Sequence, residues 1–114
     1  MLWRDISVRA KAAVNDEEKY QELITPLKRV RVLYIDDLFK TGKGQEPTTG
    51  DVNLAFEVLN ARYNDEKKLT IISSELTINQ ILEVDEGVGS RIYQRAKNNY
   101  ADLSDKQNWR LTNI

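Results

Sequence analysis

The sequence contains no cysteine and no histidine among its 114 residues. The lack of cysteine excludes disulfide frameworks and thiol nucleophiles, and the lack of both residue types excludes zinc fingers and histidine-based acid–base catalysis. Any catalysis must therefore use carboxylates, lysine, arginine, hydroxyl groups or a metal ion held by oxygen ligands.

Long apolar runs and an excess of charge of either sign are also missing. No run approaches the roughly 20 residues that span a bilayer, and the opening Met-Leu-Trp-Arg-Asp is not a signal peptide. We therefore expect a soluble, cytoplasmic protein with no membrane partner. Because 17 Lys and Arg residues face 18 Asp and Glu residues, a generally basic surface for nucleic acid is not expected, although local basic patches are compatible with this balance.

Glycine and proline are scarce, with five and two residues. The only stretch rich in both is 40–50, which predicts a loop. The length suits one domain, and a composition of 40% hydrophobic and 31% charged residues is typical of a globular core with a well-solvated surface.

Apolar residues recur at helical spacing in five segments. Asp16 is a predicted N-cap because two glutamates follow it, where the helix dipole favours acidic side chains. Pro26 lies inside the pattern that follows, so we expect a kink or a break near Thr25. The predicted helices are 5–14, 16–27, 49–63, 77–82 and 87–97, with Asp5, Thr49 and Thr77 as further caps.

Two short apolar runs rich in β-branched residues, Val30–Ile35 and Leu69–Ser73, predict strands. The first run is typical of a strand buried on both faces of a parallel sheet. Residues 2–4 resemble the end of a further strand, and 100–111 could hold one or two more. Because strands alternate with helices, the sequence predicts an α/β fold in one domain, residues 1–114, as a three-layer sandwich with a mainly parallel sheet.

Polar residues follow both predicted strands directly: Asp36-Asp37 after the first and Ser73-Ser74-Glu75 after the second. In open α/β sheets, ligands bind beyond the carboxyl ends of the strands. A hydrophobic strand that ends in two carboxylates is the Walker B pattern, in which the first acid binds Mg²⁺ and the second can orient an attacking water. The same acidic pair can instead form a turn or a helix cap, and Ser74-Glu75 can be an ordinary helix entry.

Four segments taken together carry a more specific signal than any one alone. They are Val-Leu-Tyr-Ile-Asp-Asp-Leu-Phe, Asp-Val-Asn-Leu-Ala-Phe-Glu-Val-Leu-Asn-Ala-Arg-Tyr, Thr-Ile-Ile-Ser-Ser-Glu-Leu-Thr and Gly-Ser-Arg-Ile. With these segments in this order, the chain from Trp3 to Leu111 resembles the DnaC/DnaI-type helicase loaders of the AAA+ ATPases. The resemblance implies the carboxyl-terminal two-thirds of a P-loop NTPase core, with ATP and Mg²⁺ as cofactors. It also implies a replicative helicase and single-stranded DNA as partners, and a homo-oligomer.

The resemblance also implies roles for single residues. Asp36 corresponds to the Walker B aspartate that helps to hold Mg²⁺, and Asp37 occupies the place of the catalytic acid, which in most AAA+ proteins is Glu. Ser74 falls at sensor 1, where a polar residue contacts the γ-phosphate or the attacking water. Arg91 resembles the arginine finger presented to a neighbouring subunit's nucleotide. Arg110 lies where a sensor 2 arginine can occur.

The phosphate-binding motif of such enzymes, Gly-x-x-x-x-Gly-Lys-Ser/Thr, does not occur in the sequence. The stretch Thr-Gly-Lys-Gly at 41–44 lacks the first glycine and the final hydroxyl residue, and it follows the Walker B pattern instead of preceding it. We therefore predict that this chain alone has little or no ATPase activity. We also predict that Leu69–Ser73, without the P-loop strand beside it, pairs with residues 100–103 or with another copy of the chain.

Three other functions fit parts of the pattern. An IstB-like transposition ATPase shares the four motifs. A metal-dependent nuclease could use Asp36, Asp37 and Glu75 as carboxylate ligands, and would cleave without ATP. The chain could also be a non-enzymatic module that pairs with full-length subunits.

Overall fold

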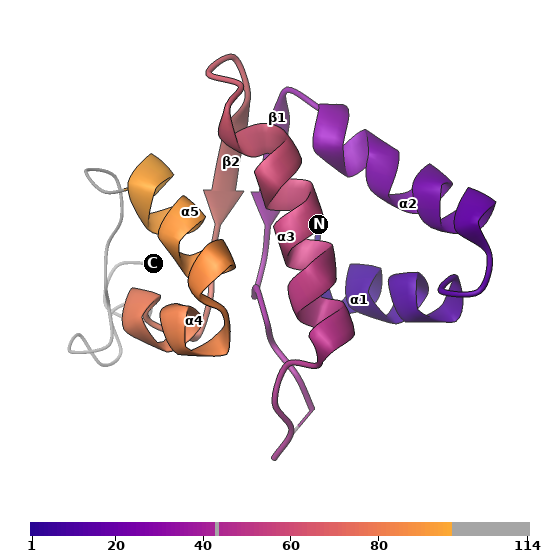
Figure 1. Cartoon of the computed structure of the whole chain (residues 1–114), viewed down its shortest axis with the longest axis horizontal. Coiled ribbons are helices and arrows are strands. Elements are labelled where there is room, and N and C mark those ends of the chain that lie inside the picture. Colours follow the sequence, from indigo (N-terminus) through magenta and orange to yellow (C-terminus); the bar gives the residue numbers. More distant parts are fainter. Residues whose placement is uncertain (43, 97–114) are drawn as a thin grey trace, which may run out of the picture.

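A computed structural model describes residues 1–42 and 44–96 of the chain. In this part of the chain, five helices and two strands follow one another along the sequence (Figure 1). They are α1 (Trp3–Ala12), α2 (Glu17–Arg29), β1 (Val32–Ile35), α3 (Thr49–Tyr63), β2 (Leu69–Ile72), α4 (Ile78–Val84) and α5 (Glu86–Ala96).

The strands β1 and β2 pair in parallel, with Val32 opposite Leu69 and Ile35 opposite Ile72. On the other side of β1, Leu2 forms a single parallel bridge with Asp36. The Trp3 amide donates to the Asp36 carbonyl at 2.9 Å, and there the chain turns into α1. The predicted strand end at 2–4 is therefore reduced to one residue, and helix α1 begins earlier than Asp5.

The predicted three-layer sandwich is wrong for the described residues, which form a two-stranded sheet with helices packed on one face and contain no P-loop core. Burial alternates along β1: Leu33 and Ile35 are buried, whereas Val32 and Tyr34 are 57% and 46% exposed. The prediction that this strand is buried on both faces is therefore wrong for the described residues. It rests on side chains that are mostly apolar on both faces, and apolar side chains on a face do not show that another element packs against it.

Helix α3 lies over the strands in Figure 1 and provides the centre of the core. Its Leu54, Ala55, Val58 and Leu59 are all buried. The rest of this cluster comes from the other four described helices, from β1 and from the turn after β1: Trp3, Ile6, Ala10, Ile24, Leu33, Ile35, Leu38, Phe39, Ile81, Val88 and Ile92. The core therefore binds α3 to the covered face of the sheet.

The helix caps are close to those predicted from the sequence. Asp16 caps α2 by accepting from the Lys19 amide at 3.1 Å, and Thr77 forms a capping box at the start of α4. The cap of α3 is Thr48, one residue before the predicted Thr49. The predicted break near Thr25 is wrong, because α2 continues through Pro26 to Arg29.

Two further predictions concern the ends of the sheet and the membrane. The expected strands at 100–111, and their pairing with Leu69–Ser73, lie outside the described residues. No helix in the described part of the chain is long and apolar enough to cross a membrane.

Candidate functional site

The carboxyl ends of β1 and β2 bring Asp36 and Ser73 into direct contact. The two residues follow paired positions of parallel strands, and the Ser73 hydroxyl donates to Asp36 Oδ1 at 2.7 Å. The Ser73 amide continues the strand ladder by donating to the Ile35 carbonyl at 2.9 Å. The predicted meeting of the two strand ends at one edge of the sheet is therefore confirmed.

The turn that follows Asp36 is held in an unusual backbone conformation. Asp37 and Phe39 have φ values of 60° and 65°, a region that costs a non-glycine residue on the order of 1–2 kcal/mol. Leu38 and Phe39 are both buried, and the Phe39 ring packs edge-on against Trp3 at 5.6 Å. The Asp37 amide donates to Ser73 Oγ at 3.1 Å. Packing and hydrogen bonds therefore fix the turn next to Asp36.

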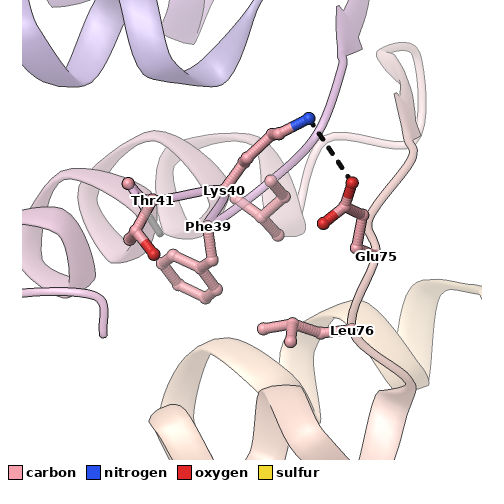
Figure 2. A pocket seen from close by; sticks show the side chains of 7 residues that line it. Phe39, Lys40, Thr41, Glu75 and Leu76 are labelled. Carbon is pink, nitrogen blue, oxygen red and sulfur yellow. Dashed lines mark ion pairs between the residues drawn. The ribbon is translucent and has the colours of Figure 1, made fainter. Parts of the chain in front are cut away.

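Asp37 and Glu75 share one lysine, because Lys40 Nζ lies 3.9 Å from Asp37 Oδ2 and 3.4 Å from Glu75 Oε1. Figure 2 shows the contact between Lys40 and Glu75 at the mouth of a pocket. The lysine and glutamate side chains are 45% and 69% exposed, so these ion pairs contribute little to stability. Their effect is to reduce the local negative charge beside Asp36.

The pocket beside this lysine has a volume of about 270 Å³. Phe39 and Leu76 form its apolar wall, and Lys40 and Glu75 stand at its polar side (Figure 2). Asp36 does not line it. The pocket therefore lies beside the ends of the strands and does not enclose them.

Ser74, the predicted nucleotide sensor, joins its own loop to the turn that follows β1. Its hydroxyl donates to the Leu38 carbonyl at 2.9 Å and accepts from the Leu76 amide at 3.1 Å. Ser73, which sequence reasoning did not single out, is the serine that contacts Asp36. Strand alternation places the residue directly after β2 on the same face as Asp36, and this signal was available in the sequence.

Arg91, the predicted finger, lies against α3. Its guanidinium stands 4.7 Å from the centre of the Phe56 ring, and its Nε donates to Asn60 Oδ1 at 2.9 Å. Arg95, one helical turn later, donates to the Tyr63 carbonyl at the end of α3. Both arginines thus join α5 to α3, and their described partners do not include Asp36 or Asp37. Arg110 lies outside the described residues.

The donor atoms at the strand ends suit a hydrated magnesium ion rather than a closed metal cage. Asp36 offers one partly exposed carboxylate, oriented by Ser73. Mg²⁺ typically keeps several waters and uses one or two carboxylates together with substrate phosphates. The described residues contain no group of three carboxylates, histidines or cysteines that could hold a metal. The three carboxylates of the alternative nuclease, Asp36, Asp37 and Glu75, therefore do not form such a group.

Arg62 is a buried residue that sequence reasoning missed. Its side chain is only 2% exposed and donates to the carbonyls of Leu27, Val30, Arg31 and Leu69 and to the Thr70 hydroxyl. Burial lowers the pKa of Arg62, although the guanidinium stays protonated at neutral pH. It joins the end of α2 to the starts of β1 and β2, so its role is to hold the sheet rather than to bind a ligand.

Asp51 is a second buried charge that was missed. It completes the capping box of α3 with Thr48, accepts from Ser7 of α1, and lies 3.4 Å from Lys11 Nζ. Burial raises the pKa of Asp51, but the hydrogen bonds from Ser7 and Thr48 and the charge of Lys11 outweigh burial, so this pKa lies below its ordinary value. Its position at N3 of a helix was the available signal.

Comparison with known proteins finds two relatives in Bacillus subtilis (strain 168). The chain is 50% identical to "Uncharacterized protein YqaM" over 72 residues, which cover 62% of this chain and 23% of that protein. It is 40% identical to "Phage-like element PBSX protein XkdC" over 81 residues, which cover 70% of this chain and 30% of that protein. The chain thus spans less than a third of either relative. No protein-family model and no solved structure matches it.

Proposed function

We propose that this chain is part of a DNA-replication ATPase of the helicase-loader type, and that Asp36 and Ser73 mark the place where ATP is hydrolysed. The contact between the Ser73 hydroxyl and Asp36 Oδ1, at the carboxyl edge of two parallel strands, is the observation that carries the proposal. The printed name of XkdC, a phage-like element protein, supports a phage setting. Such a protein works in the cytoplasm.

In this proposal each residue at the strand ends has a distinct task. Asp36 would hold Mg²⁺, and Ser73 would orient the Asp36 carboxylate by its hydrogen bond to Oδ1. A bound Mg²⁺ would neutralise charge on the β- and γ-phosphates. Asp37 orients the attacking water, and Lys40, 3.9 Å away, limits the repulsion between its carboxylate and the phosphates.

Arg91 acts in trans in this proposal. Its described contacts are with α3 and with its own helix, so it would serve the nucleotide of a neighbouring copy in a homo-oligomer. To reach that nucleotide, the Arg91 guanidinium would have to leave the Phe56 ring, and contacts with the second subunit would have to offset the lost cation–π interaction. The replicative helicase and single-stranded DNA complete the set of proposed partners.

The test uses a chimera in which this 114-residue chain replaces the matching segment of XkdC. The proposal expects the chimera to hydrolyse ATP in the presence of Mg²⁺, and the free chain to show little or no turnover because it lacks the phosphate-binding motif. Asp36→Asn in the chimera should reduce kcat at least 100-fold while ATP binding is retained, because the lost interaction forms mainly in the transition state.

The matched control is Asp5→Asn, an exposed aspartate of α1, which should leave kcat unchanged. A chimera that binds no ATP, or one in which the Asp36 and Asp5 variants behave alike, would reject the proposal. Stimulation of hydrolysis by a transposase instead of a helicase would favour the IstB-like alternative. Cleavage of DNA by the chimera without ATP would favour the nuclease.

A further inference from the structure

The segments that lead into the two strands bring cations together at one end of the sheet. Arg29 ends α2, Arg31 directly precedes β1, and Lys67 and Lys68 directly precede β2. The two segments meet there, because the Leu69 amide donates to the Arg31 carbonyl at 2.7 Å. In Figure 1 they lie at the end of the sheet that points away from α4. We call the four cationic residues the basic edge.

Three side chains of the basic edge have no partner in the described part of the chain. Arg29, Arg31 and Lys67 are exposed, and their side chains form no described hydrogen bond or ion pair. Lys68 differs, because it pairs with Asp65 at 3.5 Å. A chain with a net charge of −1 thus presents three unpaired cations on two neighbouring segments.

Buried contacts fix the backbone that carries these cations. Arg62 donates to the carbonyls of Val30 and Leu69 from its buried position, and Lys68 Nζ donates to the Lys28 carbonyl at 2.9 Å. The last carbonyls of a helix carry a partial negative charge that would repel an anion. Because Arg62 and Lys68 cover carbonyls at the end of α2, an anion can approach the basic edge.

The residue types at the basic edge decide which polyanion fits it. Stable protein interfaces bury about 800 Å² on each partner around an apolar core, and Val30 is the only apolar residue among 28–31 and 65–68. Proteins bind single-stranded nucleic acid by stacking its bases on aromatic rings, and neither stretch contains an aromatic residue. The backbone of a duplex needs neither feature, because the release of its counterions provides the free energy of binding.

We infer that the basic edge binds the phosphate backbone of duplex DNA, without preference for sequence because phosphate contacts carry no sequence information. The strands separate this surface from Asp36 and Ser73 by about 13 Å, so both can be occupied at once. The partner differs from the single-stranded DNA of the proposed function. Because neither ATP nor Mg²⁺ takes part, this inference and the proposed function can fail independently.

Binding of the free chain to a fluorescent duplex of about 20 base pairs, followed by anisotropy, tests the inference. Three phosphate contacts predict a slope of about −2.7 for log K against log salt, which is roughly a 40-fold loss between 50 and 200 mM. Arg29→Gln with Arg31→Gln should reduce the slope to about −0.9 and weaken binding at 50 mM about tenfold or more. The matched control, Arg4→Gln with Arg9→Gln, removes two exposed arginines of α1 and should leave the slope unchanged.

Glu66→Gln gives a test in the opposite direction. It removes an exposed carboxylate beside Lys67 that would repel phosphate, so this variant should bind the duplex more tightly. All variants should keep the unfolding midpoint of the parent, because the described contacts do not use the altered side chains. No binding at 50 mM salt, or equal losses in the two double variants, would overturn the inference. Tighter binding of a single strand, or of polyglutamate of equal charge, would also overturn it and assign the basic edge to that partner.

Discussion

Arg62 shows how a single side chain can connect three segments of the fold. The backbone carbonyls at the end of α2 and at the starts of β1 and β2 have no hydrogen-bond partner within their own element. The guanidinium supplies five donors in a fixed planar fork, and those of Arg62 reach the carbonyls of Leu27, Val30 and Leu69, among others. A lysine has one donor group and could not span these positions.

Arg62→Ala should therefore lower the free energy of unfolding by about 3 kcal/mol or more, because several buried carbonyls would lose their partners together. Urea denaturation followed by circular dichroism measures this change. Arg4→Ala, at an exposed position of α1, is the control and should change stability by less than about 0.5 kcal/mol. Equal effects of the two substitutions would show that the Arg62 contacts do not support the sheet.

Asp51 should make folding sensitive to acid. Its pKa is lower in the folded chain than in the unfolded chain, so the unfolded state binds more protons as the pH falls through this range. The stability that Asp51 contributes is complete above its unfolded pKa of about 4, and is lost as the pH falls toward its folded pKa.

Asp51→Asn should cost about 2 kcal/mol at pH 7, since a buried cap and its charge-assisted hydrogen bonds are weakened. The same substitution should flatten the loss of stability below pH 4, measured by urea denaturation at a series of pH values. Asp5→Asn provides the comparison. If stability falls equally steeply below pH 4 with and without Asp51, this carboxylate is not the cause of the acid sensitivity.

The sequence pattern predicted where the candidate site lies more accurately than it predicted which side chains meet there. The end of each apolar strand could be read from the sequence, so Asp36 and the Ser73–Glu75 segment were expected at one edge. Ser74 is predicted from the resemblance alone, whereas the alternation of side chains along β2 places Ser73 on the face of Asp36. Arg62 could not be predicted, because its partners come from three segments that meet only in the folded chain.

At the scale of elements, Gly89 determines how closely α4 and α5 approach. A Cβ atom at this position would lie 2.9 Å from the Leu82 Cα, a backbone contact that cannot give way easily. Gly89 belongs to the Gly-Ser-Arg-Ile segment that also carries Arg91. Its structural role is independent of any role of the arginine.

Gly89→Ala should thus destabilise the chain by more than about 1 kcal/mol through overpacking, despite the higher helix propensity of alanine. Gly50→Ala, in the first turn of α3 where the nearest atom is 3.7 Å away, should stabilise it by about 0.5 kcal/mol. Thermal unfolding of both variants compares them directly. If both substitutions stabilise the chain, the close approach of α4 and α5 is incorrect.

Elements were predicted well where the signal is local. Asp16 and Thr77 mark helix starts because capping depends on residues three or four positions away. The layers around β1 were predicted incorrectly. Residues 30–35, Val-Arg-Val-Leu-Tyr-Ile, are mostly apolar on both sides of the strand, so the sequence does not reveal that one face is left exposed by the described elements.

At the scale of the whole molecule, the described helices cover one face of the sheet, and Asp36 and Ser73 lie at the end of the other face. That other face carries the exposed side chains of Val32, Tyr34, Leu69 and Ile71.

The proposed function puts the nucleotide-bound metal beside Asp36 and Ser73. Nuclear magnetic resonance of the XkdC chimera, with Mn²⁺ and a non-hydrolysable ATP analogue, locates the ion directly. We predict that the amide signals of Asp36 and Ser73 broaden most, and that those of Val32 and Leu69, about 13 Å away at the other end of the strands, broaden much less. Broadening centred elsewhere would contradict this placement of the metal.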